Sequence, residues 1–178
     1  METMSKINCK AELSAVVIRA DGTREDLGVI STREFETWWK RLFEYLGLRR
    51  VRGLVTTAGV TYMASDFASG GATPTISGFK YHDCGTNTSP AEGITNTALG
   101  TPWGGARVIG TPTNPSAQVY RSVATITFNN TFGIVEWGMF SAAAVGTLWD
   151  RRVFAAINVV NLDAIQFTYN LTVNSGGS

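Results

Sequence analysis

Hydrophobic and polar residues alternate along most of this chain with the period of two that is typical of β-strands. The first run covers Ala11 to Ile18, and a second covers Arg24 to Ile30. Asp21-Gly22-Thr23 separates them, and an Asp-Gly pair tolerates the positive φ of a hairpin turn. The chain is therefore predicted to open with a β-hairpin.

The period of an amphipathic helix follows the hairpin. Ser31 to Glu34 has the form of a capping box, and Gly47 stands where a left-handed residue often closes a helix. Between them runs the apolar stripe Phe35, Trp38, Trp39, Leu42, Phe43 and Leu46. A helix face with this many aromatic rings is unfavourable in water. The pattern therefore predicts that the helix either covers the domain's own core or docks on a neighbouring subunit. The sequence leaves both open.

A second helix is predicted from Thr56 to Ala68, with Val60, Met63, Ala64 and Phe67 on one face. Beyond Thr73 the chain is rich in Thr, Asn, Gly and Ser and contains all five prolines. The strand candidates there are Thr75–His82, Ala106–Thr111, Gln118–Phe128, Phe132–Ser141, Arg151–Val160 and Ala164–Val173.

Short strands separated by polar turns predict a mainly β fold, an antiparallel β-sandwich with an N-terminal hairpin and one or two short helices. Three regions are expected: an arm and hairpin (1–31), an aromatic amphipathic helix as an insertion or docking element (32–50), and a β-sandwich domain (51–178). The stretch from Gly85 to Gly105 exceeds the usual length of a connection and is predicted to be a contact or binding loop, with Trp103 as its aromatic residue.

Composition narrows the classes of function. Only 16% of the 178 residues are charged, and the formal net charge is +1, so no broad basic field exists to hold nucleic acid. The basic cluster that includes Arg49 and Arg50 is local, and is predicted to be a solvated helix end or a protein contact. No stretch has the roughly 20 apolar residues of a membrane span, and nothing near Met1 marks the chain for secretion, so synthesis in a reducing cytosol is expected.

Chemistry-bearing residues are sparse. The single histidine, His82, can share a strand face with Cys84 but not with Asp83, so a structural or contact role is predicted in place of a metal or catalytic site. Cys9 and Cys84 are expected to be free, buried thiols, although a disulfide between them stays open.

A glycosidase-like pair of carboxylates would require Glu136 and Asp150 to meet. An ion pair between Glu136 and Arg151 or Arg152 is the simpler prediction. No catalytic residue, metal ligand or cofactor-binding residue is assigned.

Ordered short motifs between Val51 and Val173 carry a resemblance to a known group. The motifs are Thr56–Gly59, His82–Thr86, Thr97–Leu99, Tyr120–Ile126, Ile134–Ser141, Gly146–Arg151 and Ile165–Tyr169. In this order they resemble a widespread group of small structural proteins of tailed bacteriophages. The β-domain is also similar in layout to the N-terminal domains of phage tail-collar fibres, where a Glu-x-Gly-Leu-Phe strand precedes a Gly-x-Leu turn.

The resemblance implies a virion protein without a cofactor, assembled in the cytoplasm of the host bacterium. Association with capsid genes favours a capsid decoration or cement protein that binds the major capsid protein and its own copies, as a homo-oligomer such as a trimer. A tail, baseplate or fibre-anchoring protein is the alternative, and a host-glycan-binding module is the third. Neither nucleic acid nor membrane is an expected partner. The residues predicted to form the interface are Phe35, Trp38, Trp39, Leu42, Phe43, Leu46, Arg49, Arg50 and Trp103.

Overall fold

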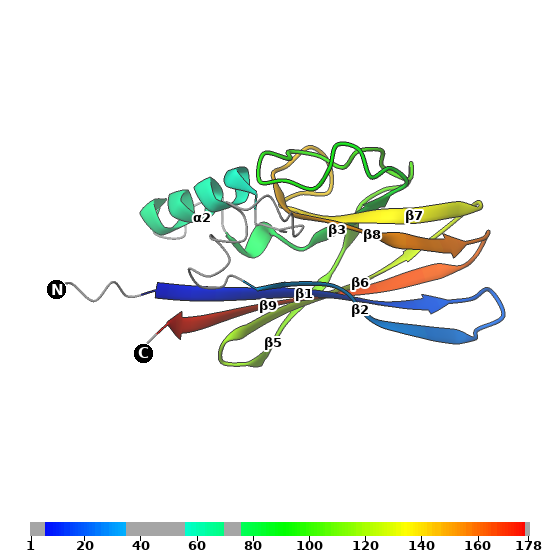
Figure 1. Ribbon diagram of the computed structural model, residues 1–178, viewed down its shortest axis with the longest axis horizontal. Helices are drawn as coiled ribbons and strands as arrows, with labels where there is room; N and C mark the ends of the chain where they lie inside the picture. Colours follow the sequence, from blue (N-terminus) through cyan, green and yellow to red (C-terminus); the bar gives the residue numbers. More distant parts are fainter. Residues whose placement is uncertain (1–5, 35–55, 70–75, 177–178) are drawn as a thin grey trace, which may run out of the picture.

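The computed structural model describes residues 6–34, 56–69 and 76–176, which form two antiparallel β-sheets packed face to face (Figure 1). The predicted β-sandwich is confirmed. Its elements in chain order are β1 (Lys6–Ile18), β2 (Arg24–Glu34), α2 (Thr57–Ser69), a 3-10 turn (Ile76–Gly78), β3 (Tyr81–Gly85), β4 (Val108–Ile109), β5 (Thr111–Ser116), β6 (Val119–Thr127), β7 (Phe132–Phe140), β8 (Leu148–Val159) and β9 (Ala164–Gly176).

The N-terminal hairpin is an integral part of the larger sheet. The five-stranded sheet has the order β2-β1-β9-β6-β5, and the four-stranded sheet has the order β4-β3-β7-β8. β1 pairs with β9 from Lys6↔Gly176 to Ile18↔Ala164. The predicted boundary at residue 31 therefore falls within β2, and the five-stranded sheet combines strands that precede this boundary with strands that follow it.

The capping box predicted at Ser31–Glu34 is wrong. These residues are the last four of β2, in register with β1 from Leu13↔Ser31 to Lys10↔Glu34. The backbone of these residues forms its hydrogen bonds with β1 and not within a helix. Pairing with a distant strand therefore outweighs the local preference for a helix start. The rest of that predicted helix lies outside the described residues.

The second predicted helix is confirmed as α2, but its inward face differs from the prediction. Thr56 caps the helix, since its Oγ1 accepts a hydrogen bond from the Gly59 backbone N–H at 3.0 Å. The Thr56 N–H also donates to the carbonyl of Trp149 at 2.8 Å, which fixes the helix at one rotation. Tyr62 consequently packs on Phe79, while Val60 is 48% exposed.

Two of the predicted strands differ in detail. Thr75–His82 contains the 3-10 turn, so its strand begins only at Tyr81. Ala106–Thr111 is divided, because the chain crosses at Gly110 from β4 in one sheet to β5 in the other. A Cβ at Gly110 would lie 2.3 Å from Ser122 Oγ, so only glycine fits this close crossing.

The core lies between the sheets and is rich in aromatic rings. Trp137 of β7 stacks on Tyr169 of β9, with ring centroids 5.2 Å apart. Both rings are fully buried, as are Leu13 and Phe167. α2 and the loop after β3 lie at the four-stranded sheet, away from the outer face of the five-stranded sheet (Figure 1). In the described part of the chain, no helix has the length and hydropathy of a membrane span.

Candidate functional site

His82 is a buried link between the two sheets. Its Nδ1 accepts a hydrogen bond from Trp137 Nε1 at 3.1 Å, and its Nε2 lies 2.7 Å from Ser122 Oγ on β6. Because Nδ1 is the acceptor, Nε2 carries the proton and donates it to Ser122. Burial lowers the pKa of His82 to about 3, so the ring is neutral at physiological pH. The geometry agrees with the predicted structural role.

The residues that follow His82 point to opposite faces of the sheet, as predicted. Cys84 is in the core, whereas Asp83 forms an ion pair with Arg107 at 3.5 Å. Arg107 also lies over the Phe140 ring and donates to the carbonyls of Ala142 and Val145. Cys9 and Cys84 are both free, with Cys9 only half-buried. Among the described residues, no group of three His, Cys, Asp or Glu side chains is placed to hold a metal ion.

Glu136 and Arg151 form a buried ion pair on the outer side of the four-stranded sheet. The distance from Glu136 Oε2 to Arg151 Nη2 is 2.7 Å, and both side chains are at most 1% exposed. The predicted ion pair of Glu136 with Arg151 or Arg152 is thus confirmed, and the partner is Arg151. Met139↔Asp150 and Gly138↔Arg151 are opposite pairs in the register, so Asp150 and Arg151 lie on different faces. Glu136 and Asp150 are therefore not brought together as two carboxylates of one site.

The Glu136–Arg151 pair holds the long loop between β3 and β4 on the sheet. The Glu136 carboxylate accepts hydrogen bonds from the backbone N–H groups of Gly100 and Thr101, both at 2.9 Å. Arg151 Nη1 donates to the Pro90 carbonyl at 2.7 Å and to Asn96 Oδ1 at 3.1 Å. Four loop residues thus depend on one charge pair, which gives this loop a fixed position.

Trp103, the loop residue predicted to contact a partner, packs on the chain's own core. Its ring contacts Phe128 and Phe132 with centroids 5.0 Å and 5.7 Å apart. The backbone N–H of Trp103 donates a hydrogen bond to the carbonyl of Cys84 at 3.0 Å. The ring is only partly buried, so its role in an interface stays a prediction. The other predicted interface residues, from Phe35 to Arg50, lie outside the described residues.

A second buried charge pair lies between the sheets. Arg152 Nη2 is 2.7 Å from Asp150 Oδ2, and the Arg152 guanidinium is 6.0 Å from the Tyr169 ring centroid. Trp149 Nε1 donates to the Tyr169 hydroxyl at 3.1 Å, and burial raises the pKa of that hydroxyl. These interactions join β8 to β9 across the core and supply hydrogen bonds to polar groups that would be costly to bury unpaired.

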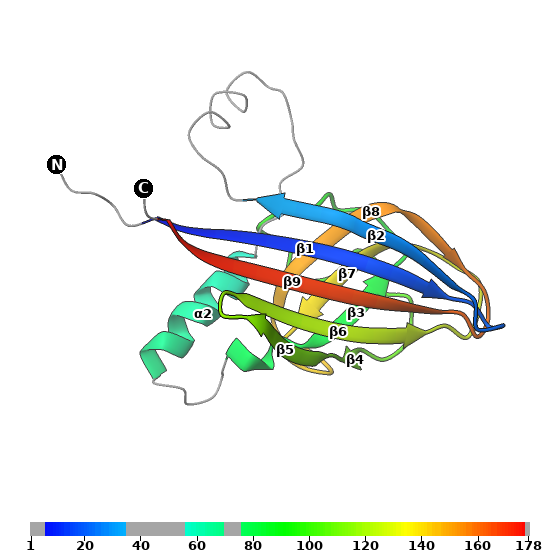
Figure 2. The same ribbon diagram turned by 90° about the horizontal axis from the view of Figure 1, so that it is seen from below.

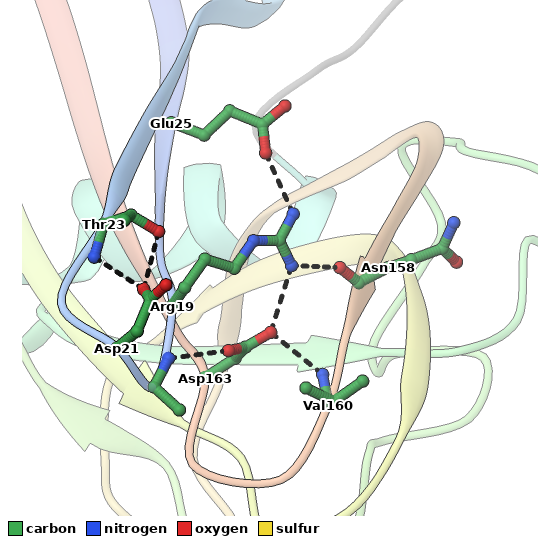
Figure 3. A network of polar contacts seen from close by, with 8 residues as sticks. Arg19, Asp21, Thr23, Glu25, Asn158, Val160 and Asp163 are labelled. Atoms are coloured by element: carbon green, nitrogen blue, oxygen red, sulfur yellow. Dashed lines mark hydrogen bonds and ion pairs between the residues drawn. The ribbon is translucent and has the colours of Figure 1, made fainter.

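Asp163 clamps the β1–β2 hairpin to the turn between β8 and β9 (Figure 3). Its Oδ1 accepts from the Ala20 N–H at 2.9 Å, and its Oδ2 accepts from the Val160 N–H at 3.0 Å and from Arg19 Nη1 at 3.0 Å. Arg19 also donates to Glu25 at 2.9 Å. The Val160 N–H, with help from Arg19, lowers the pKa of Asp163. The pattern of alternation could not reveal this clamp, because its members are far apart in the sequence.

Replacing Asp163 with asparagine is expected to destabilise the protein in a pH-dependent way. Because the folded-state pKa of Asp163 is lowered, its stabilising effect is present above the unfolded-state pKa and is lost as pH falls through the folded-state value. The urea midpoint of Asp163→Asn should therefore lie below that of the wild type at pH 7, and the difference should shrink toward pH 2. A difference that stays constant over this range would contradict the assignment.

A small pocket lies beside this clamp. Its volume is about 220 Å³, below the range of roughly 300–1,000 Å³ that holds a drug-sized ligand. It is lined by Val17, Arg19, Glu25, Leu27, Ala156, Ile157 and Asn158. The charged groups on its wall, Arg19 and Glu25, are already paired with each other.

The outer face of the five-stranded sheet has a different character, since it is broad and its three central strands carry few charged residues. Arg24 of the neighbouring β2 reaches onto this face, where its Nη2 lies 3.5 Å from Gln166 Oε1. Figure 2 looks onto this face, and β1, β9 and β6 lie in front with nothing drawn over them. The register aligns nine uncharged residues there in three rows across β1, β9 and β6: Ile18, Ala164 and Thr127; Val16, Gln166 and Thr125; Ser14, Thr168 and Val123. We call these nine residues the neutral face.

The neutral face spans roughly 10 Å across the strands and roughly 13 Å along them. The charged residues of these three strands, Lys6, Lys10, Glu12 and Arg121, lie toward one end. The sequence contained one signal of this face, because the alternation in β9 and β6 places four of its residues on the polar side of their strands: Gln166, Thr168, Thr125 and Thr127. Only the sheet order shows that they adjoin.

Comparison of the chain with protein-family models, curated proteins and solved structures found no significant match.

Proposed function

We propose that this chain is a structural component of a tailed-bacteriophage virion, and that it acts by binding other virion proteins and its own copies. Within that role, we propose a capsid decoration or cement protein whose main partner is the major capsid protein. The observation that carries the proposal is the neutral face, in which nine uncharged residues of three central strands adjoin, with Arg24 of β2 at its border.

Charge depletion is the feature that separates the centre of a protein interface from ordinary surface. A solvated sheet face usually alternates toward polar and charged residues, whereas Val16, Ile18 and Val123 share this face with threonines. Thr and Gln side chains supply hydrogen-bonding groups without the desolvation cost of a charge. The rigid sheet beneath them needs little ordering on binding, which lowers the entropic cost of association.

The buried polar clusters support the same role. Glu136–Arg151, Asp150–Arg152 and the Asp163 clamp each bind parts of this chain to one another. Their effect is to hold the loop, the core and the hairpin in place. A decoration protein repeats one weak contact over many copies, so a stable scaffold with one broad contact face fits that task.

The test is the number of copies per particle. Quantitative mass spectrometry of purified virions of a phage that encodes this chain should find it in hundreds of copies, in fixed ratio to the major capsid protein. A few to a few dozen copies would instead support the tail or baseplate alternative. A chain missing from purified particles would contradict both.

The neutral face can be tested in the same particles with Thr168→Arg, on β9 between Ser14 and Val123. The variant is expected to lower incorporation several-fold, because it buries an unpaired charge in the contact. Thr131→Arg, on the exposed β6–β7 turn, is the matched control and should be incorporated normally. Both variants should unfold within about 0.5 kcal/mol of the wild type. Equal incorporation of the two variants would show that the neutral face is not the surface that contacts other virion proteins.

A further inference from the structure

The two sides of the sandwich differ in how their sheet edges are protected. On one side, β5 contains Pro112 and Pro115, which have no N–H to offer another strand, and β4 is only two residues long. On the other side, the edge strands are β8, of 12 residues, and β2, of 11 residues, and neither contains proline; β2 is the edge of the five-stranded sheet. Within the described part of the chain, no strand pairs with its outer edge. Such an edge is a template for strand addition.

The charges along β2 are self-complementary when two copies of the strand run antiparallel. With Val29 opposite Val29 of a second copy, Arg24 falls opposite Glu34 and Glu25 falls opposite Arg33. Asp26 then falls opposite Thr32, so no like charges meet. Opposite charges placed directly across an antiparallel pair stabilise it, and like charges destabilise it.

The faces of the strand agree with this alignment. Ile18↔Arg24 and Lys10↔Glu34 place Arg24 and Glu34 on the outer face, since both β1 partners alternate with the buried residues of β1. Val17↔Glu25 and Ala11↔Arg33 place the second charged pair on the inner face. Residues opposite each other in an antiparallel pair must share a face, and both pairs do.

β2 has two bulges, and they are arranged about the same centre. Two residues, Leu27 and Gly28, face one residue of β1, and Ile30 is an extra residue between Val29 and Ser31. A bulged edge discourages pairing with a straight strand. In a two-fold contact centred on Val29, however, the Leu27–Gly28 bulge of one copy lies opposite the Ile30 bulge of the other copy. The regular residues on both sides of the bulges therefore stay in one register. Val29 at the centre is 52% exposed.

We infer that β2 pairs with β2 of a second copy across a two-fold axis at Val29, which joins the two five-stranded sheets into one. The contact is isologous, so every charge pair occurs twice. The inference rests on the self-association in the proposed function, and it adds that the outer edge of β2 is the surface through which two copies bind. It also joins copies in twos, so a trimer would require a different contact.

A charge swap tests the alignment. Arg24→Glu alone and Glu34→Lys alone each place two like-charged pairs in the contact, and each is expected to raise the dimer Kd about tenfold or more in sedimentation. The double variant Arg24→Glu/Glu34→Lys restores opposite charges and should return the Kd to within about threefold of the wild type. Thermal unfolding of each variant shows whether the fold is intact. A double variant no better than the single variants overturns the inference.

Cross-linking tests the register independently. In a Cys9→Ala background, Val29→Cys should form a disulfide-linked dimer under mild oxidation, because directly opposite Cβ atoms are close enough for the bond. Val160→Cys, with a similar exposure of 51%, is the control and should remain mostly monomeric on a denaturing gel. A wild-type chain that is monomeric, or that forms trimers insensitive to Arg24→Glu, would overturn the β2 contact. The copy number in virions would still decide the proposed function.

Discussion

Replacing Glu136 with glutamine should lower the free energy of unfolding by about 3–5 kcal/mol, because it leaves the buried Arg151 guanidinium without its counter-charge. The same change weakens the acceptor for the Gly100 and Thr101 N–H groups, which are neutral donors in the loop. Urea denaturation at pH 7 measures the loss. Limited proteolysis should also cut the loop between β3 and β4 sooner than in the wild type, because the loop depends on this pair.

An exposed ion pair provides the control for Glu136→Gln. Glu25 forms a 2.9 Å ion pair with Arg19, but its side chain is 56% exposed. Glu25→Gln should therefore change stability by no more than about 1 kcal/mol. Equal losses for the two glutamine variants would mean that burial does not determine the effect. The double variant Glu136→Gln/Arg151→Met should lose less than the sum of its single changes, since it removes both charges.

Replacing Gly85 with alanine should cost roughly 3 kcal/mol, near the upper end of overpacking effects. A Cβ at this position would lie 2.3 Å from Glu136 Oε1 and 2.4 Å from the Thr101 carbonyl oxygen. Neither group moves freely, because Glu136 is held by Arg151 and Thr101 O accepts the Thr86 N–H. The variant must therefore displace the loop or the ion pair, and its urea midpoint should fall accordingly.

Gly133→Ala is the matched control for Gly85→Ala. Gly133 also lies in a strand of the four-stranded sheet, but a Cβ there would meet only Asn158 Oδ1, at 3.5 Å. This variant should be neutral or slightly stabilising, because alanine restricts the unfolded chain more than glycine does. If both alanine variants have the stability of the wild type, the close approach at Gly85 is not a constraint on the fold.

Local patterns were sufficient to predict most of the strands. The alternation in Ala164 to Val173 predicted β9 from its first residue, although the strand continues to Gly176, and Asp21-Gly22-Thr23 predicted the first turn. The same local reasoning was wrong at Ser31–Glu34, where a capping signal lies within a strand. Four residues with helix-start chemistry cannot outweigh a row of hydrogen bonds to β1, whose position depends on β9 at the far end of the chain.

The candidate site divides in the same way. Opposite faces for His82 and Asp83 followed from strand periodicity. Charge limited the partner of Glu136 to Arg151 or Arg152, and only the strand register decided for Arg151. The neutral face did not follow, because its rows combine β1, β9 and β6, which are far apart in the sequence. The clamp at Asp163 was missed for the same reason.

The sequence by itself therefore determined the period-two strands, the hairpin turn, the second helix and the low charge, all of which depend on residues within a few positions of each other. The tertiary structure decided the sheet order, the rotation of α2, the end of β2 and the neighbours of each buried charge. These depend on which distant strands pair, and pairing is set by the combined burial and hydrogen bonding of the whole sandwich.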